Sequence, residues 1–572
     1  MKTRSIKIIK LIIKNFRGIG SVGLEIDIDD VVVLVGPNNS GKSTILKAFQ
    51  LVTSSSDTKI KIDDFFKKDE NNKPEIEVWS KVLIPESVTI DTQKWVADDN
   101  IVKEKWLWDN TEEPATRLGY RIDLSRWAST TDIPQAPFSN DNAARAYRPY
   151  PTYISPFDQP EKQVEEIKKI ISADIYDLIK KSKKEDPKYC KLVNDVNELQ
   201  EEMRVEASQK ENELADGIGS ILNDLFIGTT ISLHVPQNSP DLFASYANTK
   251  DIDFKINGLS LENQGSGMQR MLLWSVLKML AGRRKVHAKK KGSTSKILSN
   301  TNNNDEVEPE RSKVLLMDEP EICLHPESIR QAKEILYSLS SSGEWQIMIT
   351  THSPVFIDLS KNNTNIIRVQ KEEESVSLFK TNDAELSPVE KEQIKMLNIF
   401  DPYFAEFFFS KITIVVEGDT EFTAFRKIIE LDKVKYKDIH IIRARGKYTI
   451  IPIIKILKKW GKKFSVLHDS DDETNQQSWP ANSQILELVN VDKKIRLLAT
   501  KKNFEKAFFE NIVEKDKPYN AYNEVSKPHI LNKVTNLLNY LCNIDAELDQ
   551  SIKQCVCEYK SIKELKEFVD TL

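Results

Sequence analysis

The sequence contains few cysteines, and their spacing excludes two kinds of structural site. The five cysteines among 572 residues stand at positions 190, 323, 542, 555 and 557. No pair shows the spacing of zinc ligands, and the set does not form a disulfide framework. We therefore expect a protein of a reducing cytoplasm, without a zinc ribbon.

Long apolar runs are also lacking, which argues against a membrane-spanning helix. Such a helix needs about 18 apolar residues in succession, and no stretch of the sequence approaches that. Ile6–Ile13 superficially suggests a signal peptide, but Lys7 and Lys10 interrupt it and no small-residue cleavage site follows. We expect a first β-strand there and no membrane partner.

Neither sign of charge is in large excess. Against 82 Lys and Arg stand 87 Asp and Glu, a formal net charge of −5. Any nucleic-acid site must therefore be a local patch. Hydrophobic residues make up 40% of the chain and charged residues 30%, which suits a length of about three folded domains.

Apolar periodicity predicts an α/β protein, because short β-rich runs alternate with helical stretches. A helix is expected over Thr44–Val52, whereas residues 86–160 show no clear period. The predicted strands are Ile6–Ile13, Val31–Val35, Ile76–Ile84, Val314–Met317, Gln346–Ile349, Ile412–Val416, His440–Ile442, Phe464–Leu467 and Ile495–Leu498.

Changes in composition suggest the domain boundaries. A charged helical stretch is interpreted as a two-helix hairpin, because Pro187 cannot continue its first helix. A later stretch rich in Lys, Ser and Asn is interpreted as an exposed, mobile insertion. The predicted parts are 1–160, the N-terminal part of a first domain; 161–227, the hairpin; 228–385, the C-terminal part of that domain with the insertion at 283–313; 386–410, an aromatic connector helix; and 411–572, a second domain with a C-terminal helical segment.

A phosphate-binding motif follows the strand Val31–Val35. Residues 36–44 match G-x-x-x-x-G-K-S between a strand and a helix. Backbone amides can wrap a phosphate there, Lys42 can reach the β- and γ-phosphates of ATP, and Ser43 can bind Mg²⁺. The predicted ATP contacts of the loop are Gly36, Asn38, Asn39, Ser40, Gly41, Lys42, Ser43 and Thr44.

Two further strands end in residues that suit ATP hydrolysis. The strand Val314–Met317 runs into Asp318 and Glu319, and a later strand ends at Thr-Thr-His352-Ser-Pro. Asp318 is placed to hold the magnesium shell, and Glu319 to orient or deprotonate the attacking water.

With Ser266-Gly267 before an apolar helix, these motifs resemble the ABC-type ATPase head of chromosome-maintenance and recombination proteins. The resemblance implies that Ser266 and Gly267 cap the γ-phosphate held by a partner protomer and that His352 is the switch histidine. It also implies a homodimer or higher homo-oligomer. The hairpin at 161–227 would then be a dimerisation element or, in the plainer interpretation, a solvated arm.

A second acidic group follows residue 410. Glu417 comes directly after the strand Ile412–Val416, and Glu421 stands one helical turn later. Asp469 and Asp471 end a later strand. Because parallel strand ends meet at one crevice, these acids would repel one another unless a divalent cation compensated them. Oxygen ligands favour Mg²⁺, Mn²⁺ or Ca²⁺ over zinc.

The pattern E-G-x-x-E followed by D-x-D resembles a Toprim domain, and an ABC-type head followed by Toprim is the arrangement of the OLD (overcoming lysogenization defect) nuclease family. Within it, the chain resembles Gabija-like and retron-linked anti-phage effectors. The resemblance implies the metal ligands Glu417, Glu421, Asp469, Asp471 and Glu505, and the nuclease residues Glu417, Asp469, Asp471 and Lys527. Five lysines before Asp469 offer DNA phosphate contacts or form a solvated helix face: Lys455, Lys458, Lys459, Lys462 and Lys463.

The leading interpretation is an ATP-hydrolysing, metal-dependent DNA endonuclease, an anti-phage effector whose cleavage is regulated by nucleotide. Two alternatives remain: a non-nucleolytic repair or recombination ATPase, and a scaffold or sensor holding a partner effector such as a reverse transcriptase with its nucleic acid. A topoisomerase is disfavoured because no tyrosine lies in a recognisable DNA-gate module. The predicted cofactors are ATP and Mg²⁺, with Mn²⁺ or Ca²⁺ as alternatives at the second acidic group.

Overall fold

The computed structural model describes residues 6–54, 59–83, 90–138, 144, 148–155, 165, 168, 171, 210–223, 231–234, 253–290, 312–359, 361, 363–371, 376–380, 386–401, 403–461, 463–489, 494–513 and 515–570. The chain divides into two compact units. The first comprises Met1–Leu34, Gly41–Phe356 and Lys371–Val376, and the second Val35–Ser40, Ile357–Gln370 and Ser377–Leu572. Among the helices in the described ranges, none is both long and apolar enough to cross a membrane.

The first unit contains an antiparallel sheet with the order β2-β1-β4-β5-β6-β7. Strand β1 (Ile6–Lys14) confirms the strand predicted at Ile6–Ile13, and every second residue over most of its length faces the core. The strands are β1 (Ile6–Lys14), β2 (Leu24–Asp27), β4 (Glu75–Val82), β5 (Ile101–Leu107), β6 (Thr116–Arg121) and β7 (Arg126–Trp127).

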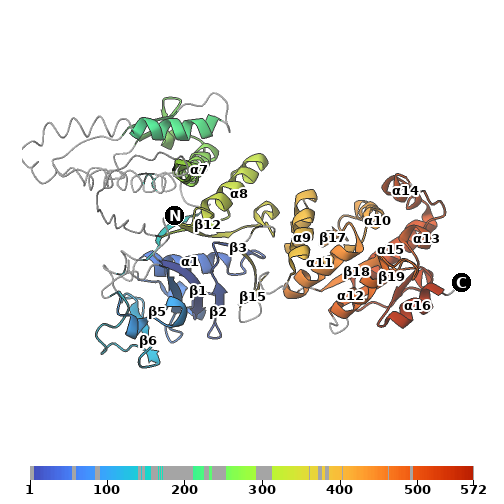
Figure 1. Ribbon diagram of the computed structural model, residues 1–572, viewed down its shortest axis with the longest axis horizontal. Helices are drawn as coiled ribbons and strands as arrows, with labels where there is room; N and C mark the ends of the chain where they lie inside the picture. The colour runs from blue at the N-terminus through green and yellow to red at the C-terminus, as the bar shows by residue number, and fades with distance from the viewer. Residues whose placement is uncertain are drawn as a thin grey trace, which may run out of the picture. The chain divides into compact units, whose positions relative to one another are not determined.

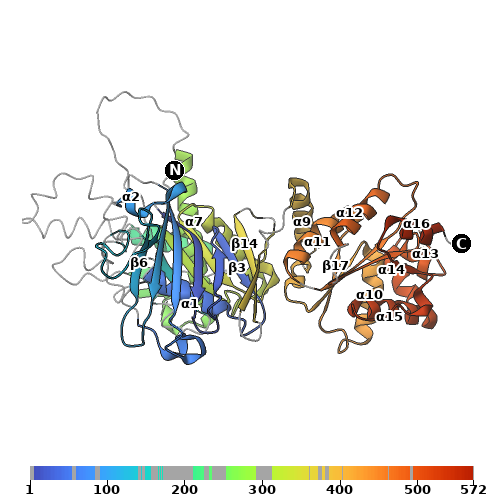
Figure 2. The same ribbon diagram turned by 90° about the horizontal axis from the view of Figure 1, so that it is seen from below.

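Four parallel strands form the second layer of this unit. They lie side by side in the order β3 (Val31–Val35), β13 (Trp345–Thr350), β12 (Lys313–Asp318) and β8 (Tyr150–Ile154). Helix α1 (Lys42–Ser54) packs against both sheets, and α8 (Pro326–Ser340) packs against β13 and against α7 (Ser266–Lys290) (Figures 1 and 2). Because both faces are covered, β3 and β13 are buried along their whole length.

The stretch 86–160, which shows no period in the sequence, supplies β5, β6, β7 and β8. Glu104 hides the alternation of β5, because this charged residue occupies an inward position between Val102 and Trp106. Its Oε1 accepts hydrogen bonds from Arg117 Nε at 2.6 Å and from Arg148 Nη2 at 3.3 Å. All three charged side chains are buried. Because they pair across distant positions of the chain, the sequence of β5 alone does not show that Glu104 faces the core.

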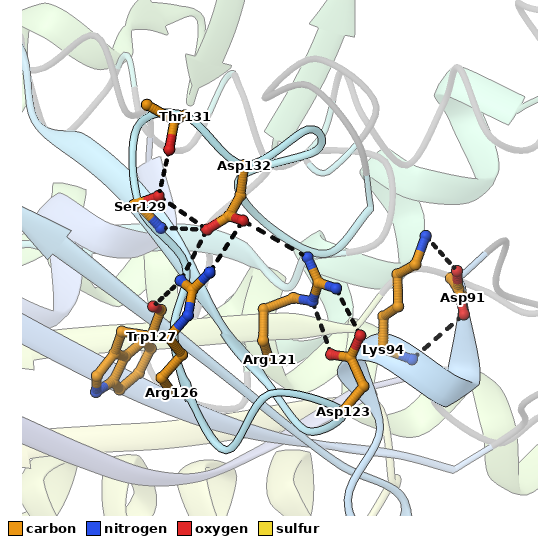
Figure 3. Close-up of polar contacts among 9 residues, drawn as sticks. All are labelled: Asp91, Lys94, Arg121, Asp123, Arg126, Trp127, Ser129, Thr131 and Asp132. Carbon is orange, nitrogen blue, oxygen red and sulfur yellow. Dashed lines mark hydrogen bonds and ion pairs between the residues drawn. The ribbon is translucent and has the colours of Figure 1, made fainter.

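A network of charged side chains fastens the β6–β7 hairpin (Figure 3). Asp132 Oδ2 lies 2.8 Å from Arg126 Nη1 and 2.7 Å from the backbone nitrogen of Ser129. These hydrogen bonds hold the pKa of Asp132 far below its usual range. Beside it, Arg121 pairs with Asp123 through two hydrogen bonds. Arg121 also lies 3.9 Å from Asp132, which joins the two ion pairs into one network, whereas Asp91 and Lys94 form a separate pair (Figure 3).

Two predicted segments fall largely outside the described residues. Of the hairpin at 161–227, residues 210–223 are helical, and the break at Pro187 is not among the described positions. Helix α7 continues to Lys290, through the first residues of the stretch predicted as an insertion from 283. The Lys, Arg and Ala residues there favour a helix. Residues 291–311 lie outside the described part of the chain.

The second unit is built on a five-stranded sheet with the order β17-β16-β18-β19-β20. Its first four strands are parallel and confirm the four strands predicted after residue 410. Helices α10 (Asp419–Leu431), α14 (Lys517–Glu524) and α15 (Pro528–Cys542) lie on one face, and α11 (Lys447–Lys459) and α12 (Trp479–Val489) on the other (Figures 1 and 2). The strands are β16 (Ile412–Val416), β17 (Ile439–Arg443), β18 (Phe464–Asp469), β19 (Ile495–Thr500) and β20 (Val556–Glu558).

The connector predicted as one helix over 386–410 is two helices. Helix α9 (Pro388–Phe400) starts with a capping box between Ser387 and Glu390. It ends before Asp401-Pro402, since proline disfavours a helical residue in front of it. A 3₁₀ helix, η10 (Phe404–Phe408), follows.

Candidate nucleotide and nuclease centres

Three parallel strands of the first unit end at the same edge. Asp318 of β12 stands in register with Thr350 of β13, and Thr350 with Leu34 of β3. The backbone nitrogen of Thr351 also donates to the carbonyl of Leu34 at 3.1 Å. The segments that follow these three strands therefore gather at one crevice, as in other open α/β sheets.

Lys42 and His352 contact each other at this edge. The Nζ atom of Lys42 lies 3.0 Å from Nε2 of His352, and because an ammonium can only donate, His352 accepts in its neutral form. Burial and the Lys42 charge both lower the pKa of His352. Beside them, Asp318 Oδ1 accepts from Ser43 Oγ at 3.1 Å and from Thr350 Oγ1. The structure thus brings together residues predicted to bind the phosphates and the magnesium ion of ATP.

Glu319 and Glu321 complete this group. Glu319 adopts a left-handed conformation with φ of 48°, and its Oε1 lies 3.7 Å from Nε2 of His352. Glu321 accepts a 2.6 Å hydrogen bond from the backbone nitrogen of His352, and burial raises the pKa of Glu321. The sequence analysis did not assign Glu321 to the site; its position two residues after Glu319 was the available signal.

The phosphate loop has a glycine where no other residue fits. Gly36 has a φ of +152°, and a Cβ there would lie 2.2 Å from the carbonyl oxygen of Val369. Asn39 is left-handed, with φ of 60°. Ser40 is 2% exposed, and its Oγ has no hydrogen-bond partner within the described residues. A buried hydroxyl in this position suits a phosphate oxygen as its partner.

The turn at Ser266-Gly267, which begins α7, lies beside the loop that follows Glu319. A Cβ on Gly267 would lie 3.6 Å from the carbonyl oxygen of Cys323. Gln269, on the first turn of α7, donates to the carbonyls of Leu261 and Gln264 at 3.1 Å each, which fixes the approach to the helix. The side chain of Ser266 is outside the described part of the structure.

The acids of the second unit also stand at the ends of parallel strands. Asp469 closes β18 and pairs in register with Thr500 of β19. Its Oδ1 accepts hydrogen bonds from Thr500 Oγ1 at 2.7 Å and from the backbone nitrogen of Phe504 at 2.9 Å. Glu417, directly after β16, accepts from the backbone nitrogen of Asp469 at 3.1 Å. These contacts place two predicted nuclease acids next to each other.

Burial and mutual repulsion disturb three of these carboxyl groups. Burial raises the pKa of Glu417, Glu421 and Asp469, and the charge of Asp469 raises the first two further. The side chain of Glu421 is the most deeply placed, at 2% exposed. These three groups are stable in their ionised form only beside positive charge. Their carboxylate oxygens fit a divalent cation that prefers oxygen ligands.

As the side chains stand, however, no three Asp, Glu, His or Cys groups in the described ranges converge as a metal site. Their hydrogen bonds give a reason. Asp469 is engaged by Thr500 and Phe504, and Asp471 by Lys447. Binding a cation through Asp471 therefore requires its carboxylate to exchange Lys447 for the ion, whereas the hydrogen bonds of Asp469 can persist, because a carboxylate accepts several contacts at once.

Glu505 belongs to the same neighbourhood. It is 5% exposed, and its Oε1 accepts from Thr420 Oγ1 at 2.9 Å and pairs with Lys517 Nζ at 3.2 Å. Its charge contributes to the raised pKa of Asp469. The structure thus brings the fifth predicted ligand close to the other acids.

Three of the lysines predicted to serve the nuclease, Lys455, Lys458 and Lys527, have other partners. Lys459 and Lys463 are exposed, whereas Lys462 is not among the described residues. Two hydrogen-bonded glutamates raise the pKa of Lys527. The partners are Glu510 and Glu524 for Lys527, Glu390 for Lys455 and the carbonyl of Leu488 for Lys458.

Lys447 is a residue of this centre that the sequence analysis missed. It begins α11 directly after Gly446, and its side chain is 2% exposed. Its Nζ donates to Oδ2 of Asp471, and its charge opposes the rise in the pKa of Glu417 and Asp469. The available signal was a Gly-Lys pair at the end of β17, which neighbours the strand before Glu417.

Comparison with protein families separates the same two functions. The model described as "AAA ATPase domain" matches residues 6–113 and 142–357, more than half of the chain. The model described as "Overcoming lysogenization defect protein-like, TOPRIM domain" matches residues 408–471. The chain belongs to the OLD family. Its two matched regions confirm the predicted fusion of an ATPase with a Toprim domain.

Two relatives of this OLD-family protein are named as nucleases. The Old nuclease of Escherichia phage P2 is 24% identical over 492 residues, which cover 82% of this chain and 78% of that protein. The OLD nuclease of Thermus scotoductus is 26% identical over 167 residues, 28% of this chain and 31% of the relative. Among solved structures, the Smc head bound to the C-winged helix domain of ScpA aligns with a TM-score of 0.40 and 15% identity over 67% of this chain and 99% of its own.

The OLD-family protein is therefore an ATPase joined to a nuclease, as the sequence predicts. Glu417, Glu421, Asp469 and Asp471 fall inside the matched Toprim region, whereas Glu505 and Lys527 follow it.

Proposed function

We propose that this protein is a divalent-metal-dependent DNA endonuclease whose cleavage is regulated by the nucleotide bound to its ATPase. The observation that carries the proposal is the group of buried acids at neighbouring strand ends, where Glu417 accepts a hydrogen bond from the backbone of Asp469. Their mutual repulsion suits cation binding at the end of a parallel sheet. A phosphodiester is the substrate that such a cation would act on.

In the ATPase, Lys42 would bind the β- and γ-phosphates, while Ser43 and Asp318 would hold Mg²⁺. The loop Gly36–Thr44 would supply backbone contacts, with Asn38, Asn39 and Ser40 near the phosphates. Glu319 would position the attacking water. The 3.7 Å separation of Glu319 Oε1 from His352 Nε2 supports a shared role at the γ-phosphate.

In the Toprim domain, Mg²⁺, with Mn²⁺ or Ca²⁺ as alternatives, would be held by carboxylates from Glu417, Glu421, Asp469, Asp471 and Glu505. Such an ion neutralises a scissile phosphate and lowers the pKa of bound water. The chain's own residues orient the ligands, and Thr500 aims Asp469 through a 2.7 Å hydrogen bond. Lys527 remains a proposed source of positive charge for the cleaved phosphate.

The proposed biological setting follows the same resemblance. The protein would act in the cytoplasm as an anti-phage effector related to Gabija-like and retron-linked systems, with a second component such as a reverse transcriptase as a possible partner class. Ser266 and Gly267 would cap ATP in a second protomer, so the working form would be a homodimer or a higher homo-oligomer, with the helical segment at 161–227 as a dimerisation element.

Cleavage of supercoiled, linear and single-stranded DNA, with Mg²⁺ or Mn²⁺ and with or without ATP, tests the proposal. We expect cation-dependent nicking of the supercoiled form, stopped by EDTA and changed in rate by ATP. Absence of cleavage in every combination, with ATP hydrolysis intact, would favour the repair ATPase. Stable co-purification of a partner without cleavage would favour the scaffold.

A further inference from the structure

Lys447 occupies a position that the fold defines closely. Gly446 precedes it with a φ of +136°, a backbone conformation that residues other than glycine rarely adopt. The backbone nitrogen of Gly446 donates to the carbonyl of Glu417 at 3.1 Å, and that of Ala444 to the carbonyl of Val416 at 2.9 Å. The turn that carries Lys447 is thus fastened to the strand end that carries the first nuclease acid.

The side chain of Lys447 is directed to another acid of the same centre. With 2% of the side chain exposed, its Nζ is bonded to Oδ2 of Asp471. Asp471 is itself held in a left-handed conformation, with φ of 61°, and its backbone nitrogen donates to the carbonyl of Lys502 at 3.0 Å. Both members of the pair are therefore fixed by the backbone.

A buried lysine is costly unless it is paired, and carboxylates buried together are costly for the same reason. Glu417, Asp469 and Asp471 each interact electrostatically with the Lys447 ammonium. One buried cation therefore offsets the charge of several acids. The same bond keeps Asp471 from joining the other carboxylates.

We propose that Lys447 is a built-in counter-ion of the nuclease centre. It pairs with Asp471 when no divalent cation is bound, and it competes with an incoming divalent cation for that carboxylate. The inference rests on the proposed metal-dependent function. Lys447 acts as a positioning residue, because its effect on the cation passes through Asp471. No bond is made or broken beyond this exchange of ionic partners.

Mn²⁺ binding to the full-length protein without nucleotide tests the exchange. In Lys447→Met, the competitor is gone, so the affinity for Mn²⁺ should rise about fivefold or more. The melting temperature in EDTA should fall and recover as Mn²⁺ is added. A merely structural role of Lys447 predicts two other results: the variant is destabilised equally with and without Mn²⁺, and its affinity for Mn²⁺ is unchanged or lower. Either result would overturn the proposal.

Lys455→Met is the matched control, since Lys455 lies on the same helix and pairs with Glu390 at 2.7 Å. Its Mn²⁺ affinity should equal that of the wild type. If Lys447→Met does not fold, the double variant Lys447→Met/Asp471→Asn replaces the pair by neutral groups and should fold in EDTA. A double variant that also fails to fold contradicts the proposal, because Lys447 would then serve more than Asp471.

These measurements do not depend on DNA cleavage. Tighter Mn²⁺ binding by Lys447→Met in a protein that never cuts DNA would refute the proposed endonuclease while supporting the counter-ion. Normal DNA cleavage by the wild type, together with unchanged Mn²⁺ binding by Lys447→Met, would support the endonuclease and refute the counter-ion.

Discussion

Lys42 and His352 lie 310 positions apart in the chain, yet their Nζ and Nε2 atoms are separated by 3.0 Å. The lysine that would bind the phosphates thus contacts the histidine that would sense them. A phosphate group bound by Lys42 would compete with His352 for the ammonium, so we expect nucleotide binding to change this contact.

Lys42→Ala should lower ATP hydrolysis on the order of 100-fold or more, because a buried charge aimed at the phosphates is lost. Phosphate release measures the effect. Lys47→Ala is the control, since Lys47 lies on the same helix and contacts Gln50 at 3.1 Å. Hydrolysis by Lys42→Ala at the wild-type rate would show that the loop does not act on ATP.

Asp469→Ala should abolish plasmid nicking and leave ATP hydrolysis unchanged, because it removes a carboxylate that Thr500 and Phe504 orient. Nicking and phosphate release are measured on the same preparation. Asp472→Ala is the matched control: Asp472 is exposed and accepts from the backbone nitrogen of Thr474 at 3.1 Å. Undiminished nicking by Asp469→Ala would refute the assignment of the nuclease centre.

Gly36→Ala should eliminate ATP binding, because the added methyl group would stand 2.2 Å from the carbonyl of Val369 and force the phosphate loop to move. Binding of a fluorescent ATP analogue gives the measurement. Gly18→Ala should bind normally, since nothing lies within 4 Å of a Cβ placed there. Equal affinities of the two variants would be incompatible with the loop conformation described.

Glu104→Gln should destabilise the first unit by about 3–5 kcal/mol, because Arg117 and Arg148 would remain buried without a countercharge. Urea unfolding followed by tryptophan fluorescence, to which the neighbouring Trp106 contributes, reports the loss. Glu113→Gln, an exposed substitution, should have little effect. A loss no larger than that of the control would show that these three buried charges contribute little to stability.

The interaction of Glu104 with its two arginines also predicts a pH dependence of stability. Burial alone would raise the pKa of Glu104, but the two guanidinium groups outweigh it and lower the pKa. The stabilisation is therefore complete above the usual value of 4.5 and is lost as the pH falls through the lowered folded value. The difference in unfolding free energy between wild type and Glu104→Gln should be constant near neutral pH and shrink only in acid.

The sequence predicts most strands and both acidic groups, because each depends on a short pattern. The run Val31–Val35 before the phosphate loop and Ile412–Val416 before Glu417 were confirmed as β3 and β16. Residues that directly follow such strands lie at the carboxyl end of the sheet, so the local sequence is sufficient to place them.

Other features depend on contacts between distant positions. Glu104 conceals the alternation of β5 until Arg117 and Arg148 are seen around it. Lys447 resembles an ordinary surface lysine in the sequence, and only the pairing of β17 with β16 brings it to Asp471. Helix α7 extends to Lys290 into the stretch predicted as an insertion, and the single helix predicted over 386–410 is divided into α9 and η10, because composition alone marks such boundaries imprecisely.

Two donors that aim Asp469, Thr500 on β19 and the backbone of Phe504, come after the matched Toprim region has ended at residue 471. A chain shortened just beyond that point would keep Glu417, Glu421, Asp469 and Asp471 but leave one carboxylate unguided. A fragment that is meant to contain the whole proposed nuclease centre therefore has to reach at least through α13 (Phe504–Phe508), past the end of the matched Toprim region.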